Sequence, residues 1–310
     1  MWALLPAPMS AETDPVHLLA ELPAWSFAGT ALAVLGRPVA HSLSPTIHHA
    51  ALATMAQSDP RFGPWRYFKF EVDPAELPRA LHELHRAGFL GLNLTVPHKT
   101  VAVPCLAASD EFVQAAGAAN TLIRTPDGWR GANTDGFGLS AALRQEFGLE
   151  LDGADVMLLG AGGAARAAAV ECLQRGCRSL WIGNRSAENL AALLEVLRVR
   201  ARGIPSQGFD LAHPPAGLPG GALVLNATSL GLKAGDASPI DLAKIPRPAM
   251  VYDMIYRPPQ TALLRQAATL GLRHANGLSM LVHQGARSLE LWSGAPVPVA
   301  EMQRAARAAG

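Results

Sequence analysis

VMLLGAGGAAR, residues 156–166, joins a short apolar strand to a glycine turn and the start of a helix. The turn has the form GxGxxA. Gly160 permits the tight turn, Gly162 lets the backbone approach a pyrophosphate, and the small Ala165 allows the helix to pack closely on the strand. The helix N-terminus then presents unpaired N–H groups and a partial positive charge to the anion. The stretch therefore predicts a dinucleotide-binding unit.

Apolar runs of strand length alternate with helical segments on both sides of this turn. Besides 156–160, the expected strands are 31–36, 67–72, 91–96, 179–184, 222–228 and 250–255. This alternation predicts an α/β fold with mostly parallel sheets. A chain of 310 residues is long enough for two domains. The turn cluster NTDGFG at 133–138 predicts a boundary between them.

The composition excludes several classes of protein. Hydrophobic residues make up 49% of the chain and charged residues 16%, which excludes a disordered polyelectrolyte. The 26 basic and 25 acidic residues nearly cancel, so nucleic acid and anionic membranes are not expected partners. No apolar run reaches the length of a membrane span. Three cysteines without a CxxC spacing form no disulfide framework, so we expect a cytoplasmic protein.

Residues 1–28 contain four prolines and little periodicity. They lack the basic region of a secretory signal. We expect them to form an N-terminal extension that packs loosely or not at all.

The residues after the 179–184 strand bear on the choice of nicotinamide cofactor. An enzyme for NAD would place Asp or Glu here to bind the ribose 2′-hydroxyl. The chain instead reads Asn184-Arg185-Ser186. Arg185 can fork onto a 2′-phosphate, and no carboxylate stands beside it to repel that group, so NADP is favoured. The alternative is that Arg185 is an ordinary surface cation.

Three further polar clusters fall at strand ends or turns: residues 41–45, 93–99 and 133–136. Open parallel sheets bind ligands outside the carboxyl ends of their strands. The side chains are hydroxyls, amides, one lysine and one aspartate, which suit a small, hydroxylated, acidic molecule.

Nine motifs then appear in one order along the chain: HSLSP, NLTVPHK, GAANTL, NTDG, GAGGAAR, NRS, NATSLG, YDMIY and NGLSMLVHQ. In this the sequence closely resembles the shikimate dehydrogenase family, from about Ala33 to Trp292. The resemblance implies a reversible, NADP-dependent reduction of 3-dehydroshikimate to shikimate in aromatic amino-acid biosynthesis. The partners implied are small molecules, for a monomer or a homodimer.

The resemblance also implies how the domains are divided. A split α/β substrate-binding domain would span 29–131 and be completed by the C-terminal helices of 277–310. A Rossmann-like NADP-binding domain would span 132–276.

Residue by residue, the family pattern places Ser42, Ser44 and Tyr256 at the substrate carboxylate. The positions that would hold ring hydroxyls are Asn93, Thr95, Asn120, Asp135 and Gln284. Taken without the family, the two serines fit a turn or helix cap before Pro45. A single Asn or Thr likewise fits a structural turn.

Lys99 matches the catalytic lysine of the family, and Asp135 its partner. Lys99 would give a proton to the ketone oxygen in reduction and take one from the hydroxyl in oxidation. A carboxylate nearby stabilises the ammonium form. Asp135 is therefore expected to orient Lys99 and hold a substrate hydroxyl rather than to make Lys99 a base.

The cofactor positions implied by the family are Gly160, Ala161, Gly162, Gly163, Ala164, Asn184, Arg185, Ser186, Thr228, Met254 and Gly277. A second basic residue often follows the NRT motif of the family, but this chain has Asn189. Arg185 would then carry the 2′-phosphate alone, with a moderate preference for NADP.

Two alternatives remain from the sequence. One is a quinate/shikimate dehydrogenase with dual cofactor use, although such proteins tend to have Thr at the position of Ser44. The other is a non-catalytic NADP-sensing homologue, against which Lys99 and Asp135 both argue. Ten histidines invite a metal site, but no cysteine or carboxylate completes one, so no metal is expected.

Overall fold

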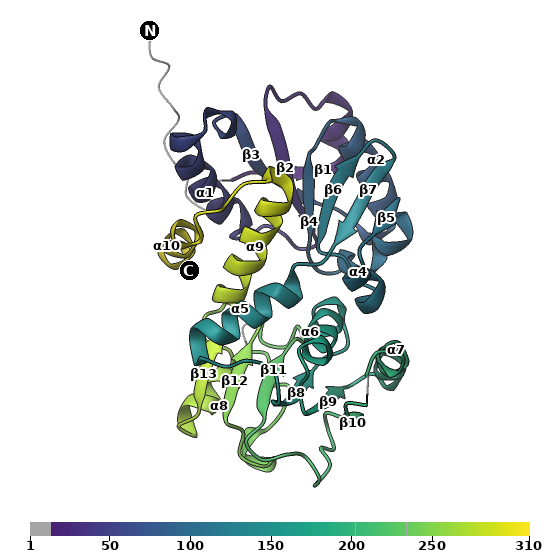
Figure 1. The fold of residues 1–310 in the computed structure, drawn as a ribbon, viewed down its shortest axis with the longest axis vertical. Helices are drawn as coiled ribbons and strands as arrows, with labels where there is room; N and C mark the ends of the chain where they lie inside the picture. The colour runs from purple at the N-terminus through teal and green to yellow at the C-terminus, as the bar shows by residue number, and fades with distance from the viewer. Residues whose placement is uncertain (1–13, 202, 234) are drawn as a thin grey trace. The chain divides into compact units, whose positions relative to one another are not determined.

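The computed structural model describes residues 14–201, 203–233 and 235–310 (Figure 1). The chain separates into two compact units. Of the described residues, the first unit contains 14–108, 120–131 and 285–309, and the second contains those of 109–119 and 132–284. Compared with the predicted domains, segments 109–119 and 277–284 fall in the second unit.

The first unit is built on a seven-stranded sheet in the order β1-β3-β2-β4-β6-β7-β5. Its strands are β1 (Val16–Leu18), β2 (Thr30–Gly36), β3 (Trp65–Glu71), β4 (Gly91–Leu94), β5 (Ala108–Ser109), β6 (Thr121–Thr125) and β7 (Gly128–Ala132). β1, β3, β2 and β4 are parallel, and β6 runs antiparallel to β4. The carboxyl ends of β2 and β4 and the amino end of β6 therefore lie at one edge of the sheet.

The helices of the first unit are α1 (Ser44–Ser58), α2 (Leu77–Arg86), α3 (His98–Val101) and α10 (Val299–Ala309), with 3-10 turns η1 (Leu19–Ala24), η2 (Pro60–Phe62), η3 (Pro74–Glu76) and η4 (Val103–Cys105). Helix α9 (Leu278–Ser293) begins in the second unit and ends in the first. A Cβ on Gly91 of β4 would lie 2.2 Å from Nε1 of Trp292, near the end of α9. Glycine at this position therefore allows α9 to pack directly on the sheet.

The second unit is built on six parallel strands in the order β10-β9-β8-β11-β12-β13. They are β8 (Asp155–Leu159), β9 (Ser179–Asn184), β10 (Ser206–Asp210), β11 (Leu223–Asn226), β12 (Met250–Asp253) and β13 (Arg273–Asn276). The helices are α4 (Glu111–Ala116), α5 (Asp135–Phe147), α6 (Gly163–Gln174), α7 (Ala187–Arg198) and α8 (Ala262–Thr269), with the 3-10 turn η5 (Leu242–Lys244). This is the Rossmann strand order, and the direction of the chain across the sheet reverses between β8 and β11.

Both faces of the second sheet are covered. On β8, Val156 and Leu158 belong to one hydrophobic core, and Met157 and Leu159 belong to another. Successive side chains of a strand point to opposite faces, so the run VMLL supplies both cores at once. Strand β8, which leads into the glycine turn, is thereby packed against a hydrophobic core on each face of the sheet.

The expectation that residues 1–28 pack loosely is wrong for Val16–Trp25. β1 pairs in parallel with β3, and Leu19 and Leu22 of η1 are buried. The Trp25 ring packs against the rings of Phe68, Phe70 and Phe89. A periodicity argument misses this because the segment is a three-residue strand followed by a short 3-10 turn, and it is held by strand pairing and aromatic contacts. Residues 1–13 lie outside the described residues.

Two adjacent histidines of α1 make the stability of the first unit dependent on pH. Burial lowers the pKa of His48 to about 4 and that of His49 to about 4. The His49 Nε2 accepts a hydrogen bond from the Tyr67 N–H at 3.0 Å, which requires an unprotonated nitrogen. Because both pKa values lie below the usual 6.5, the unfolded chain binds these protons first as the pH falls. The contribution of each neutral histidine to the free energy of unfolding is fully present above about pH 6.5. It falls by about 3 kcal/mol per histidine as the pH approaches 4.

We expect the thermal unfolding temperature of the wild-type protein to fall between pH 6.5 and pH 4. His49→Gln keeps an acceptor for the Tyr67 N–H but does not titrate, so its unfolding temperature should fall less over the same range. Calorimetry of both proteins checks this. Identical pH dependence in the two would show that His49 does not contribute.

Candidate active site

The glycine turn of the second unit lies where the sequence predicts an anion site. Gly160 follows β8 with φ +117°, and a Cβ there would lie 3.0 Å from the Ala227 carbonyl oxygen, so the position requires glycine. Gly162 caps the N-terminus of α6, and a Cβ on it would meet no atom within 4 Å. The turn thus has an open side in front of a helix N-terminus. Both features fit a dinucleotide pyrophosphate.

Three other predicted cofactor residues follow the carboxyl ends of strands in the same sheet. Thr228 follows β11, Met254 follows β12 and Gly277 follows β13. A Cβ on Gly277 would lie 2.0 Å from the Met254 carbonyl oxygen. The backbones after β12 and β13 are therefore in direct contact, which only glycine allows.

A buried polar network that the sequence analysis missed holds these strand ends. The Asp253 carboxylate, fully buried, accepts from Asn226 Nδ2 at 2.9 Å and from Thr261 Oγ1 at 2.6 Å. Asn226 Oδ1 in turn accepts from the N–H and the hydroxyl of Thr228, at 3.0 and 2.8 Å. Burial raises the pKa of Asp253, and these hydrogen bonds oppose the rise. The signal was present in the NATSLG and YDMIY motifs, as polar residues at the ends of apolar strands.

In the turn after β9, hydrogen bonds hold the residues on either side of an exposed arginine, as expected for a group that binds the 2′-phosphate. Asn184 Nδ2 donates to the Ser186 carbonyl at 2.9 Å, and Ser186 Oγ accepts from the Asn189 N–H as the cap of α7. Arg185, between them, is exposed. Asn184 and Ser186 therefore shape the turn, while Arg185 is the group that can reach a phosphate.

In the first unit, Ser42 and Ser44 occupy the connection from β2 to α1. Ser42 Oγ accepts from the Ser44 N–H at 3.2 Å, which is the local turn that the sequence left as an alternative. The contact leaves the Ser42 O–H able to donate to a ligand. The Lys69 ammonium, from β3, donates to the Ala40 carbonyl of the same connection at 3.0 Å.

Asn93 of β4 is the centre of a buried network rather than an open side chain. Its Oδ1 accepts from the Tyr67 hydroxyl at 2.7 Å, and its Nδ2 donates to the Asn120 carbonyl and to Ser288 Oγ, both at 3.0 Å. With both amide hydrogens in use, Asn93 can meet a ligand only through the second lone pair of Oδ1. It can therefore accept from a hydroxyl but cannot donate to a ketone. Thr121 Oγ1 lies in the same network, 2.8 Å from Ser288 Oγ.

The remaining predicted residues of the first unit gather at the same edge. Thr95 and Lys99 follow β4, and both are half-buried. The N–H of His98 donates to the Thr95 carbonyl at 2.8 Å, which begins the turn of α3 that carries Lys99. Asn120, just before β6, is buried.

Asp135, Tyr256 and Gln284 belong to the second unit. Asp135 is buried at the start of α5, where its N–H donates to Asn133 Oδ1 at 3.0 Å. A Cβ on Gly138, three residues later, would lie 2.7 Å from the Cβ of Gln284. Glycine thus brings the first turn of α5 against α9. Lys99 and Asp135 lie in different units, so their pairing stays a prediction.

Within the described ranges, no group of three or more His, Cys, Asp or Glu side chains could hold a metal ion. Cys172 and Cys177 are buried on or beside α6, and burial raises the pKa of Cys177 to about 11. Both behave as packing residues.

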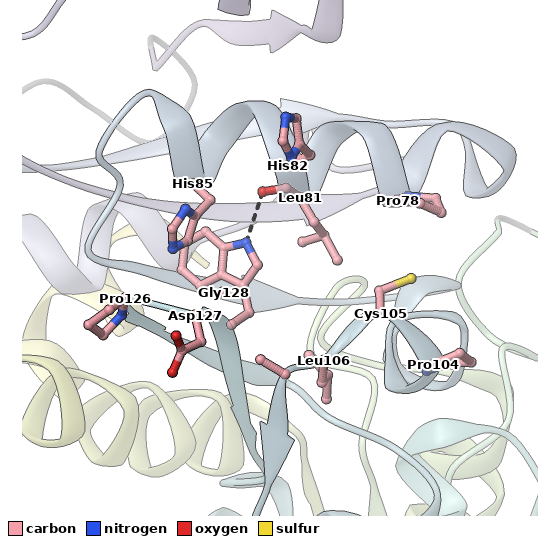
Figure 2. Close-up of a pocket in the computed structure, with 12 residues that line it drawn as sticks. Pro78, Leu81, His82, His85, Pro104, Cys105, Leu106, Pro126, Asp127 and Gly128 are labelled. Atoms are coloured by element: carbon pink, nitrogen blue, oxygen red, sulfur yellow. Dashed lines mark hydrogen bonds between the residues drawn. The ribbon is translucent and has the colours of Figure 1, made fainter.

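A pocket of about 490 Å³ lies elsewhere in the first unit, between α2, the η4 turn and the β6–β7 turn (Figure 2). Its polar ring atoms are largely engaged: Trp129 Nε1 donates to the Leu81 carbonyl at 2.8 Å, and His85 Nε2 lies 2.8 Å from the Thr125 carbonyl. None of the predicted site residues lines it.

The strand order of the second unit, its glycine turn at the reversal point and the arginine after the second strand define a dinucleotide-binding α/β protein of the Rossmann class. Residues 34–122 match the family model described as the shikimate dehydrogenase substrate binding domain. Residues 277–307 match the one described as the shikimate 5′-dehydrogenase C-terminal domain.

Individual relatives extend the match over most of the chain. An NADP(+) shikimate dehydrogenase from Thermosynechococcus vestitus is 39% identical, over 88% of this chain and 93% of its own. One from Symbiobacterium thermophilum is 39% identical, over 91% and 95%. The crystal structure of shikimate 5-dehydrogenase from Thermus thermophilus with NADP(H) and shikimate superposes with a TM-score of 0.78 at 35% identity, covering 91% of this chain and 100% of that one. This chain belongs to the shikimate dehydrogenase family. The predicted resemblance and fold class are thus confirmed.

Proposed function

We propose that this chain catalyses the reversible, NADP-dependent reduction of 3-dehydroshikimate to shikimate in aromatic amino-acid biosynthesis. The observation that carries the proposal is its identity of 39% to curated NADP(+) shikimate dehydrogenases over 88% of its length, with Lys99 and Asp135 both present. The first unit would bind shikimate and the second would bind NADP.

The residues of the second unit would hold the cofactor in three places. The open turn at Gly162 and the N-terminus of α6 would take the pyrophosphate, and Arg185 the 2′-phosphate. The segments at Thr228, Met254 and Gly277 would take the nicotinamide end. When bound, NADPH supplies a hydride to the ketone carbon of the substrate.

The residues proposed for substrate binding would orient the substrate and move the proton. The hydroxyls of Ser42, Ser44 and Tyr256 would donate to its carboxylate. Lys99 would give a proton to the ketone oxygen as negative charge develops there, and would take it back in the oxidising direction. Asp135 would accept from a ring hydroxyl and orient the Lys99 ammonium.

Arg185→Gln should raise the KM for NADP by about 10- to 100-fold, because a bidentate charge-assisted contact to phosphate is lost. The KM for NAD should change by less than about twofold, since NAD has no phosphate for Arg185 to bind. Steady-state kinetics with both cofactors checks this. Arg265→Gln, at an exposed arginine of α8, is the matched control. Equal effects of Arg185→Gln on the two cofactors would remove Arg185 from the 2′-phosphate.

The proposed activity is tested by the absorbance of reduced nicotinamide with shikimate or quinate, each against NADP and NAD. Shikimate with NADP should give the highest kcat/KM. If kcat/KM for quinate with NAD equalled that for shikimate with NADP, the quinate/shikimate dehydrogenase would be favoured. If no pair of substrate and cofactor reacted, a sensing protein would be favoured.

No helix of the described residues is long and apolar enough to cross a membrane. We place the enzyme in the cytoplasm, as a monomer or a homodimer that acts on small molecules. The free thiols of Cys105, Cys172 and Cys177 support a reducing compartment.

A further inference from the structure

Lys69 of β3 is a lysine in an unusual place. Lys69 is only 2% exposed, whereas lysines are almost never fully buried unless they are paired with an opposite charge. Its ammonium has three N–H donors, of which one reaches the Ala40 carbonyl at 3.0 Å. Among the described residues it has no other hydrogen-bond partner. Within residues 14–201, 203–233 and 235–310, the buried ammonium therefore has two N–H donors without a protein acceptor.

The Lys69 side chain lies beside the loop that carries the two serines. Tyr67 and Lys69 are two residues apart on β3, so they point to the same face of the sheet. The Tyr67 hydroxyl donates to Asn93 Oδ1 at 2.7 Å, and the Lys69 ammonium donates to the carbonyl of Ala40 at 3.0 Å. Ala40 lies two residues before Ser42 and four before Ser44 in the chain. The buried ammonium is thus next to the position proposed for the substrate carboxylate.

Among the described residues, the carboxylate of Asp14 is the charge that acts on the Lys69 ammonium through space. The β1–β3 register pairs Val16 with Lys69, which brings Asp14, two residues earlier, to the same neighbourhood. Asp14 Oδ2 is buried without a hydrogen-bond partner among the described residues. Burial lowers the pKa of Lys69, and the Asp14 carboxylate opposes this through space. Compensation without a direct contact is partial, which leaves a positive potential for a ligand to use.

We propose that Lys69 is a specificity-determining residue, which selects a carboxylate-bearing substrate by fixing the loop at Ala40 and by placing a positive charge beneath Ser42 and Ser44. The proposal rests on the proposed function, because it takes the ligand at these serines to be shikimate. Hydroxyl donors alone separate a carboxylate from an ester only by the greater strength of a charge-assisted hydrogen bond. A buried cation adds a preference for the anion that is strong where water is excluded.

The test compares the binding of shikimate with that of its uncharged methyl ester, measured as Kd by titration calorimetry. The wild-type protein should bind shikimate at least about tenfold more tightly than the ester. Lys69→Met should weaken shikimate binding about tenfold and bring the two Kd values together, with the Kd for NADP unchanged. Lys69→Arg keeps the charge and should keep most of the discrimination.

Asp14→Asn separates this role from a merely structural one. If the two residues only stabilise the fold as a pair, Lys69→Met and Asp14→Asn should weaken shikimate binding alike. On our proposal Asp14→Asn strengthens it, because an opposing charge is removed. The double variant leaves no lone buried charge, so it should fold even where Lys69→Met does not, and it should still lack discrimination.

If Lys69→Met still bound shikimate more tightly than the methyl ester by the wild-type ratio, the role of Lys69 would be overturned and the proposed function would stand. If Lys69→Met does not fold, the same ratio is measured in the double variant and decides in the same way. Failure of the wild-type protein to bind shikimate at all would overturn both.

Discussion

Lys99→Met should lower kcat for shikimate oxidation by about a thousandfold or more, while the Kd for NADP stays within about twofold. Methionine has a similar length but no proton to give or take. In either direction of the reaction, negative charge would then develop on the reacting oxygen with no side chain to give or take its proton. The cofactor should bind as before, because the residues proposed to hold it lie in the second unit and Lys99 lies in the first.

Stopped-flow kinetics and fluorescence titration of NADPH check the two parts of this prediction separately. Lys244→Met, at an exposed lysine of the η5 turn in the second unit, is the matched control and should behave as wild type. If Lys99→Met kept more than about a tenth of the wild-type kcat, Lys99 would not be the proton donor.

Gly277→Ala should abolish measurable NADP binding or prevent the second unit from folding. The new methyl group would lie 2.0 Å from the Met254 carbonyl oxygen and 2.5 Å from its carbon. Both are backbone atoms at the point where β12 and its edge neighbour β13 end, so neither can move aside as a side chain would. The ends of β12 and β13 must separate, with an expected loss of about 3 kcal/mol or more in the free energy of unfolding.

Differential scanning calorimetry with and without NADP measures this effect. Gly217→Ala is the control, because a Cβ there meets no atom within 4 Å. An unchanged unfolding temperature for Gly277→Ala, with normal stabilisation by NADP, would contradict the close contact.

The central strands of the second sheet could be predicted from the sequence because they are buried on both faces. VMLL of β8 and LVLN of β11 read as apolar runs whatever surrounds them. The edge strands β10 (SQGFD) and β13 (RHAN) carry polar residues and were not predicted. Their pairing depends on the neighbouring strand, which is a long-range contact that no local pattern encodes.

The candidate site was predictable in its residues but not in their surroundings. The motifs named Asn93, but only the structure shows its amide engaged by Tyr67, Asn120 and Ser288. Ser288 lies far along the chain, so no spacing argument could have found this network. Lys69 is a similar case, because a lysine in a strand is normally exposed. Here its ammonium donates to the Ala40 carbonyl, and the Asp14 carboxylate acts on it through space.

The reducing reaction followed to its product tests the account most directly. Purified protein, NADPH and 3-dehydroshikimate are mixed, and NADPH oxidation is measured together with shikimate formation by chromatography. We expect one shikimate for each NADPH consumed, and neither change with Lys99→Met on the same timescale. NADPH that stays reduced with the wild-type protein, or is oxidised without shikimate appearing, would contradict the proposed reaction.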